Sequence, residues 1–128
     1  MIKQDYIIRM IQEIISLIAN AIIKKKKLDN KELDTYEYTT HEILGISPKE
    51  LTGMNANEII SQYSQSENGM DKLELAAVSL LLFSEEMTDS NLLLKSKLKQ
   101  DGIFLLKYLQ ENSGSYSLQR EFIINMIS

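Results

Sequence analysis

The chain has no cysteine and no tryptophan, and its 128 residues include one proline and one histidine. The lack of cysteine excludes disulfide bonds, thiolate nucleophiles and metal sites with cysteine ligands. It also suits a reducing compartment, so we expect a cytoplasmic protein. Five glycines, 44% hydrophobic residues and 25% charged residues are ordinary for a soluble helical domain and unlike a disordered chain.

The motifs of common catalytic and phosphate-binding sites are missing as well. The sequence contains no GxxxxGKS or GxGxxG loop, no HExxH pair and no GxSxG elbow. His41 has Glu37 four residues before it and Glu42 directly after it, but two ligands from one helix do not complete a metal site. We therefore expect no enzyme, no metal and no cofactor, with an enzyme that uses His41 as the weaker alternative.

The net charge of −4 is unevenly distributed along the chain. Residues 1–27 carry six basic and two acidic groups, whereas the remainder carries eight basic and sixteen acidic groups. Because an acidic surface repels a polyanion, the sequence argues against a nucleic-acid partner.

Residues 1–27 are predicted to form an amphipathic helix with an unusually wide apolar face. Its polar residues recur at helical spacing and form one narrow stripe: Asp5, Arg9, Gln12, Glu13, Ser16 and Asn20. The apolar residues cover the rest of the circumference, so this helix must contact two neighbouring helices, or one neighbour and a second subunit. The candidate interface consists of Tyr6, Ile7, Met10, Ile14, Leu17 and Ile18.

Three other interpretations of this helix are weaker. A spanning helix needs about 20 consecutive apolar residues, and a signal peptide needs an apolar segment without charges, which Asp5, Arg9 and Glu13 interrupt. A helix that lies in the membrane plane carries basic residues along its polar face, but here the lysines are clustered at the end. Four adjacent lysines, Lys24 to Lys27, are typical of a helix C-terminus, where cations face the negative end of the dipole.

The rest of the chain has clear signals for helix starts and ends. A helix that contains Leu33, Tyr36 and Thr40 is predicted to end at Gly45. Ser47, Pro48 and Glu50 form the pattern of a capped helix start, and the short helix ends at Gly53. Asn55 and Glu58 repeat the start signal, and Asn68-Gly69 interrupts the helix that follows.

Residues 71–112 are predicted to form a central helical hairpin. The segment from Asp71 to Met87 is apolar almost all round, so it should be the buried central helix. A short turn precedes a second long helix, in which Gly102 marks a close helix contact or a bend. Ser115 or Ser117 caps a last helix. We expect one all-α domain over residues 1–128, a compact bundle of about six or seven helices.

The charges of this hairpin are placed against the helix dipoles. Lys95, Lys97 and Lys99 lie in the first half of one helix, and Glu85, Glu86 and Asp89 lie near the end of the other. One interpretation is that the two sets pair across the hairpin, at about 0 to 1 kcal/mol for each exposed pair. The alternative is a charged surface kept for a partner.

Four stretches of the sequence resemble a family of small helical proteins of unknown activity from Gram-positive bacteria: QDYIIRMI, HEILGISPKEL, LELAAVSLLLFSEEM and YLQENSGSYSLQRE. The resemblance implies an all-α fold whose second half is similar to a tetratricopeptide-type helix pair, and it implies no activity. Tyr116 and Leu118 depart from the aromatic pattern expected there. No second copy of the hairpin is visible, and a repeat array needs about three units.

The sequence therefore predicts a non-catalytic protein-interaction or homo-oligomeric module, with a homodimer as the expected assembly. The alternative is a membrane-surface factor, of the immunity or envelope type, that docks through the first helix and Lys24 to Lys27.

Overall fold

The computed structural model describes residues 2–87, 89–114 and 117–127, and the side chains of residues 2–5 and 89 lie outside this description. The described residues form helices and no strand, which confirms the all-α fold and the predicted number of helices. In chain order the elements are α1 (Ile2–Lys24), α2 (Asn30–Leu44), α3 (Pro48–Leu51), α4 (Ala56–Tyr63), α5 (Gly69–Glu86), a 3₁₀ turn η1 (Asp89–Asn91), α6 (Leu92–Asn112) and α7 (Leu118–Ile127).

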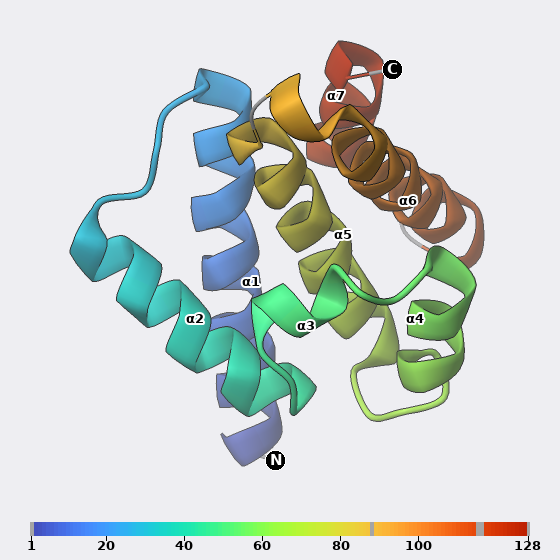
Figure 1. Ribbon diagram of the computed structural model, residues 1–128. Helices are drawn as coiled ribbons and strands as arrows, with labels where there is room; N and C mark the ends of the chain where they lie inside the picture. Colours follow the sequence, from blue (N-terminus) through green and yellow to red (C-terminus); the bar gives the residue numbers. More distant parts are fainter. Residues whose placement is uncertain (1, 88, 115–116, 128) are drawn as a thin grey trace.

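Helix α5 is the centre of the bundle. It lies between α1 and α6, and α2, α3 and α4 also contact it (Figure 1). Its side chains from Leu75 to Leu82 are all buried, as an apolar sequence without a polar face requires. The prediction of a central buried helix is therefore confirmed.

Gly102 is the point of closest approach within the α5–α6 hairpin. A Cβ atom placed on Gly102 would lie 2.7 Å from Cγ and Cδ2 of Leu81 and 3.2 Å from the carbonyl oxygen of Ala77. Because α6 continues from Leu92 to Asn112, this glycine marks a close contact and does not end the helix.

Capping boxes begin three of the helices. At α3, Glu50 N donates to Ser47 Oγ and Ser47 N donates to Glu50 Oε1. The Asn55–Glu58 pair is arranged in the same way at α4, so both predicted starts are confirmed. Asp29 and Glu32 form a third box at the start of α2, in addition to the two predicted starts.

Helix α2 ends at the predicted Gly45, whereas α4 ends at Tyr63, before the predicted break at Asn68-Gly69. Gly45 and Gly114 have φ of +80° and +76°, a left-handed conformation that glycine adopts readily. The central helix begins at Gly69, two residues before the predicted Asp71. Ser117 caps α7 by accepting a hydrogen bond from Arg120 N at 3.2 Å, whereas Ser115 lies outside the described residues.

Helix α1 packs against α5 and also contacts α2 and α7. The wide apolar face was expected to contact two neighbouring helices, or one helix and a second subunit. In the structure, helices α2, α5 and α7 of the same chain contact α1. Helices α1 and α5 run in the same direction, so their C-terminal ends meet at one end of the bundle (Figure 1).

Candidate functional site

The core covers part of the predicted interface on α1. Ile14 and Ile18 are 6% and 0% exposed, so neither side chain can contact a partner while the bundle is folded. Tyr6 is 62% exposed, and Ile7, Met10 and Leu17 are half-buried. The candidate surface is thus the outer flank of α1.

The outer flank of α1 has a regular spacing. Six of its residues alternate at intervals of four and three, and all are exposed or half-buried: Tyr6, Met10, Glu13, Leu17, Asn20 and Lys24. We call this set the α1 seam. Alternation of four and three is the spacing of one face of any helix, and helices that pair along their length place apolar residues at these positions. Tyr6, Met10 and Leu17 meet this pattern, whereas Glu13, Asn20 and Lys24 are polar. Glu13 and Asn20 also belong to the polar stripe predicted from the sequence.

Ile7 lies outside the α1 seam, beside a shallow groove. Ile7, Met10 and Ile43 give this groove an apolar part, and Glu42, Glu67, Asn68 and Lys72 line the remainder. Helix α1 and the end of α2 thus leave apolar atoms accessible between them.

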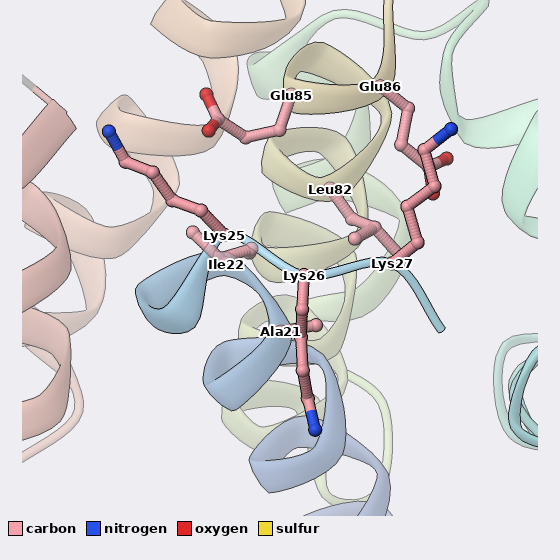
Figure 2. A pocket seen from close by; sticks show the side chains of 8 residues that line it. All are labelled: Ala21, Ile22, Lys25, Lys26, Lys27, Leu82, Glu85 and Glu86. Atoms are coloured by element: carbon pink, nitrogen blue, oxygen red, sulfur yellow. The ribbon is translucent and has the colours of Figure 1, made fainter. Parts of the chain in front are cut away.

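A second depression lies where the ends of α1 and α5 meet, and we call it the Lys–Glu pocket. It has a volume of about 210 Å³ and is lined by Ala21, Ile22, Lys25, Lys26, Lys27, Leu82, Glu85 and Glu86. Figure 2 shows Lys25 and Glu85 on one side and Lys27 and Glu86 on the other, while Lys26 extends away from both carboxylates. The sequence could not indicate this pocket, because it forms only when α1 and α5 are parallel.

The Lys–Glu pocket brings together charges of both signs. Helices α1 and α5 both direct their C-terminal, partly negative ends toward it, and Glu85 and Glu86 add two carboxylates. The three lysines follow α1 and supply the opposite charge. Among the described residues, neither glutamate has an amine within the 4.0 Å of an ion pair.

The lysines of α6 do not pair with the glutamates of α5 in the described part of the chain. Lys95 Nζ donates to the carbonyl oxygen of Met87 at 3.3 Å, which caps the end of α5. Lys97 Nζ lies 3.0 Å from both Asp101 Oδ2 and the carbonyl oxygen of Met54. Lys99 is half-buried, and the side chain of Asp89 lies outside the described residues. In the described part of the chain, Lys95 and Lys97 thus contact backbone carbonyls, and Lys97 also pairs with Asp101 on its own helix.

The possible metal ligands of the chain are His41 and the acidic side chains. His41 is exposed on α2, and no group of three or more histidine, aspartate or glutamate side chains within the described ranges could hold a metal ion.

Among the described residues, one helix is long and apolar enough to cross a membrane, by length and composition only. It is the stretch Tyr6–Lys24 of α1, and less than half of it is buried in the bundle. Ile11, Ile18 and Ala19 of this stretch are 0% exposed. The same helix could not span a bilayer without exposing the core side chains that it covers.

No protein-family model, no curated protein and no solved structure matches the chain. The resemblance to small helical proteins of Gram-positive bacteria therefore stays a prediction, as does the similarity of α5–α6 to a tetratricopeptide-type pair.

Proposed function

We propose that this chain is a non-catalytic helical module that forms a homodimer through the α1 seam. The observation that carries the proposal is that Tyr6, Met10 and Leu17 are exposed or half-buried apolar residues on one outer flank of α1. On this proposal the α5–α6 hairpin, whose size is that of a single tetratricopeptide-type pair, supports α1 and binds no peptide. We place the dimer in the cytoplasm, in keeping with the absence of cysteine.

A second copy fits the α1 seam best in an antiparallel orientation. In the register that pairs Met10 of one copy with Asn20 of the other, Glu13 lies opposite Leu17 and Tyr6 lies opposite Lys24. The tyrosine ring and the lysine amine then attract each other, by about 0.5 to 1 kcal/mol for an exposed cation–π pair. Each helix C-terminus also approaches the N-terminus of the other copy, which is the favourable arrangement of dipoles.

Polar residues at such positions have a recognised role. A single asparagine or lysine in an apolar heptad seam lowers stability but fixes register and the number of chains. On this proposal Asn20 favours one defined pairing, and the register pairs the same surface of both copies, as a twofold interface requires.

The membrane-surface function is the second candidate, because α1 is apolar over the length of a bilayer span and is followed by Lys25, Lys26 and Lys27. A membrane-surface protein would need lipid in order to associate, whereas the dimer would form without it. Binding to anionic vesicles at low salt, with a monomer in their absence, would favour it over the dimer.

Sedimentation equilibrium of the whole chain tests the proposal. We expect a dimer for the native sequence. The dissociation constant of the Leu17→Glu dimer should be at least about tenfold higher, because this substitution places a carboxylate in the seam. Leu93→Glu is the matched control, since Leu93 is 89% exposed on α6 and lies outside the seam. A native monomer at every concentration, or equal dissociation of the two variants, would contradict the proposal.

The register can be tested with substitutions that leave the core intact. Tyr6→Lys places two lysines opposite each other in the expected register and should weaken the dimer, and adding Lys24→Glu should restore it. Tyr38→Lys is the control, because Tyr38 on α2 is 70% exposed and Tyr6 is 62% exposed. Failure of the double variant to recover would exclude this register.

A further inference from the structure

We propose that Asn68 is a site of spontaneous deamidation, and that the folded junction between α4 and α5 suppresses the reaction. Asparagine is a thermally labile residue, and it reacts fastest when glycine follows it, because glycine has no side chain to hinder its backbone nitrogen. Asn68 is the one asparagine of the chain that precedes a glycine. This inference does not rest on the proposed dimer.

The reaction needs no group beyond this dipeptide and water. The backbone nitrogen of Gly69 attacks Cγ of Asn68 and loses its proton, and ammonia leaves, so that a five-membered succinimide ring forms. Water then opens the ring at one of its two carbonyl carbons. Cleavage of the new bond to Cγ gives aspartate. Cleavage of the original peptide bond gives isoaspartate, in which the chain continues through the side chain.

In the folded protein the two reacting atoms are held apart. Asn68 has φ of +58° and ψ of +33°. Because peptide bonds are planar, ψ is the rotation that moves the Gly69 nitrogen relative to the side chain of Asn68. At this ψ the nitrogen lies nearly opposite to Cβ across the Cα–C bond, so no rotation of the side chain brings Cγ within bonding distance. Ring closure therefore requires a large change of ψ.

The packing around Gly69 resists that rotation. Its backbone nitrogen donates to the carbonyl oxygen of Ser66 at 3.0 Å. A Cβ atom placed on Gly69 would collide with the carbonyl oxygens of Tyr63 and Ser64, so this backbone lies directly against the end of α4. A new ψ at Asn68 would break the hydrogen bond and move the start of α5 away from α4. Deamidation thus requires the junction to open, and its rate follows the open fraction of the chain.

The same contacts explain why the fold keeps a reactive dipeptide. Residue 68 has a left-handed conformation, which asparagine tolerates better than most residues, and residue 69 has no room for a side chain. They also separate the two products. Aspartate preserves the backbone, whereas isoaspartate lengthens it by one carbon where the packing leaves no space. The isoaspartate chain should therefore fail to recover the native start of α5.

Peptide mapping of the whole chain by mass spectrometry, at mildly alkaline pH, measures the rate. We expect the chain unfolded in guanidinium chloride to lose ammonia at Asn68 before any other asparagine. The folded chain should react at Asn68 at least about tenfold more slowly, because only its open fraction reacts. Asn68→Gln should abolish this signal, and Asn112→Gln, at an exposed position at the end of α6, should leave it unchanged.

Refolding of the products completes the test. After the denaturant is removed, the aspartate form should match the Asn68→Asp variant in its free energy of unfolding, and the isoaspartate form should unfold at a lower denaturant concentration than either. Three results would overturn the proposal: equal rates at Asn68 in the folded and unfolded chains, faster reaction of another asparagine in the unfolded chain, or an isoaspartate form as stable as the native chain.

Discussion

Arg120 on α7 and Glu74 on α5 form an ion pair in which Nε and Oε2 are 3.5 Å apart, and their side chains are only 7% and 18% exposed. Arg120 Nη1 also donates to Ser113 Oγ at 3.4 Å. A buried guanidinium needs opposite charge nearby, because leaving water is costly for an ion. This pair therefore makes the docking of α7 depend on one residue of the central helix.

Replacing Arg120 by methionine should destabilise the protein by about 3 kcal/mol, because Glu74 would keep its charge without its partner. The double variant Arg120→Met, Glu74→Leu should recover most of this loss, since it removes both ions. The coupling free energy between the two residues is measured by urea unfolding of four proteins: the native chain, the two single variants and the double variant. A double variant that is less stable than Arg120→Met alone would contradict this account.

The free energy of unfolding should depend on pH through Glu74, the acidic partner of this ion pair. Burial raises the pKa of Glu74 above its ordinary 4.5, with Arg120 opposing the rise and Asp71 adding to it. The folded protein thus holds this proton more tightly than the unfolded chain does. Its contribution to stability is complete below pH 4.5 and is lost as the pH rises through the raised pKa.

We therefore expect the free energy of unfolding of the native chain to fall relative to that of Glu74→Gln as the pH rises from about 4 to about 7. Urea unfolding of both proteins at a series of pH values measures this difference. Glu111→Gln, at an exposed position, controls for the loss of one charge. A difference that grows in favour of the native chain with rising pH would show that Arg120 outweighs burial at Glu74.

Gly102→Ala should destabilise the hairpin although alanine is the better helix former. The gain in propensity is about 1 kcal/mol, whereas overpacking costs typically about 1 to 3 kcal/mol. The new methyl group would lie 2.7 Å from Leu81, which the core holds at 0% exposure. Leu81→Ala in the same chain should relieve the clash, so the two substitutions should be less than additive in urea unfolding. If the two losses of unfolding free energy are additive, the cost of Gly102→Ala does not come from contact with Leu81.

The local part of the fold was predictable from the sequence, because its signals act over three or four residues. Ser47 with Glu50 and Asn55 with Glu58 form their capping boxes within one turn, and Gly45 ends its helix by its own conformation. Such features need no knowledge of the tertiary structure.

The candidate sites were less predictable, because they depend on which helices are neighbours. Hydrophobic periodicity gave the width of the apolar face of α1, but it could not show that α5 and its neighbours cover Ile14 and Ile18 and leave Tyr6 exposed. In the same way, Glu85 is close in sequence to Lys95, yet it shares a pocket with Lys25. The parallel arrangement of α1 and α5 determines that contact, and no local pattern encodes it.

Two buried tyrosines, Tyr36 and Tyr63, differ in what their hydroxyl groups contact. Tyr63 Oη donates to the carbonyl oxygen of Leu44 at 2.8 Å. Tyr36 is 1% exposed, and its hydroxyl lies beside the hydroxyl of Ser79. Within the described residues, neither the Tyr36 hydroxyl nor the Ser79 hydroxyl has a hydrogen bond of good geometry. Burial also raises the pKa of Tyr36, because water does not reach a phenolate there.

Tyr63→Phe should therefore lower the free energy of unfolding by about 1 to 2 kcal/mol, because the Leu44 carbonyl loses its hydrogen-bond donor inside the protein. Tyr36→Phe removes a buried hydroxyl that lacks a good partner, so its free energy of unfolding should change by less than that or increase. Urea unfolding of the two variants compares the same chemical change at two buried sites. A larger loss at Tyr36 than at Tyr63 would mean that the Tyr36 and Ser79 hydroxyls hold α2 to α5 more strongly than their geometry indicates.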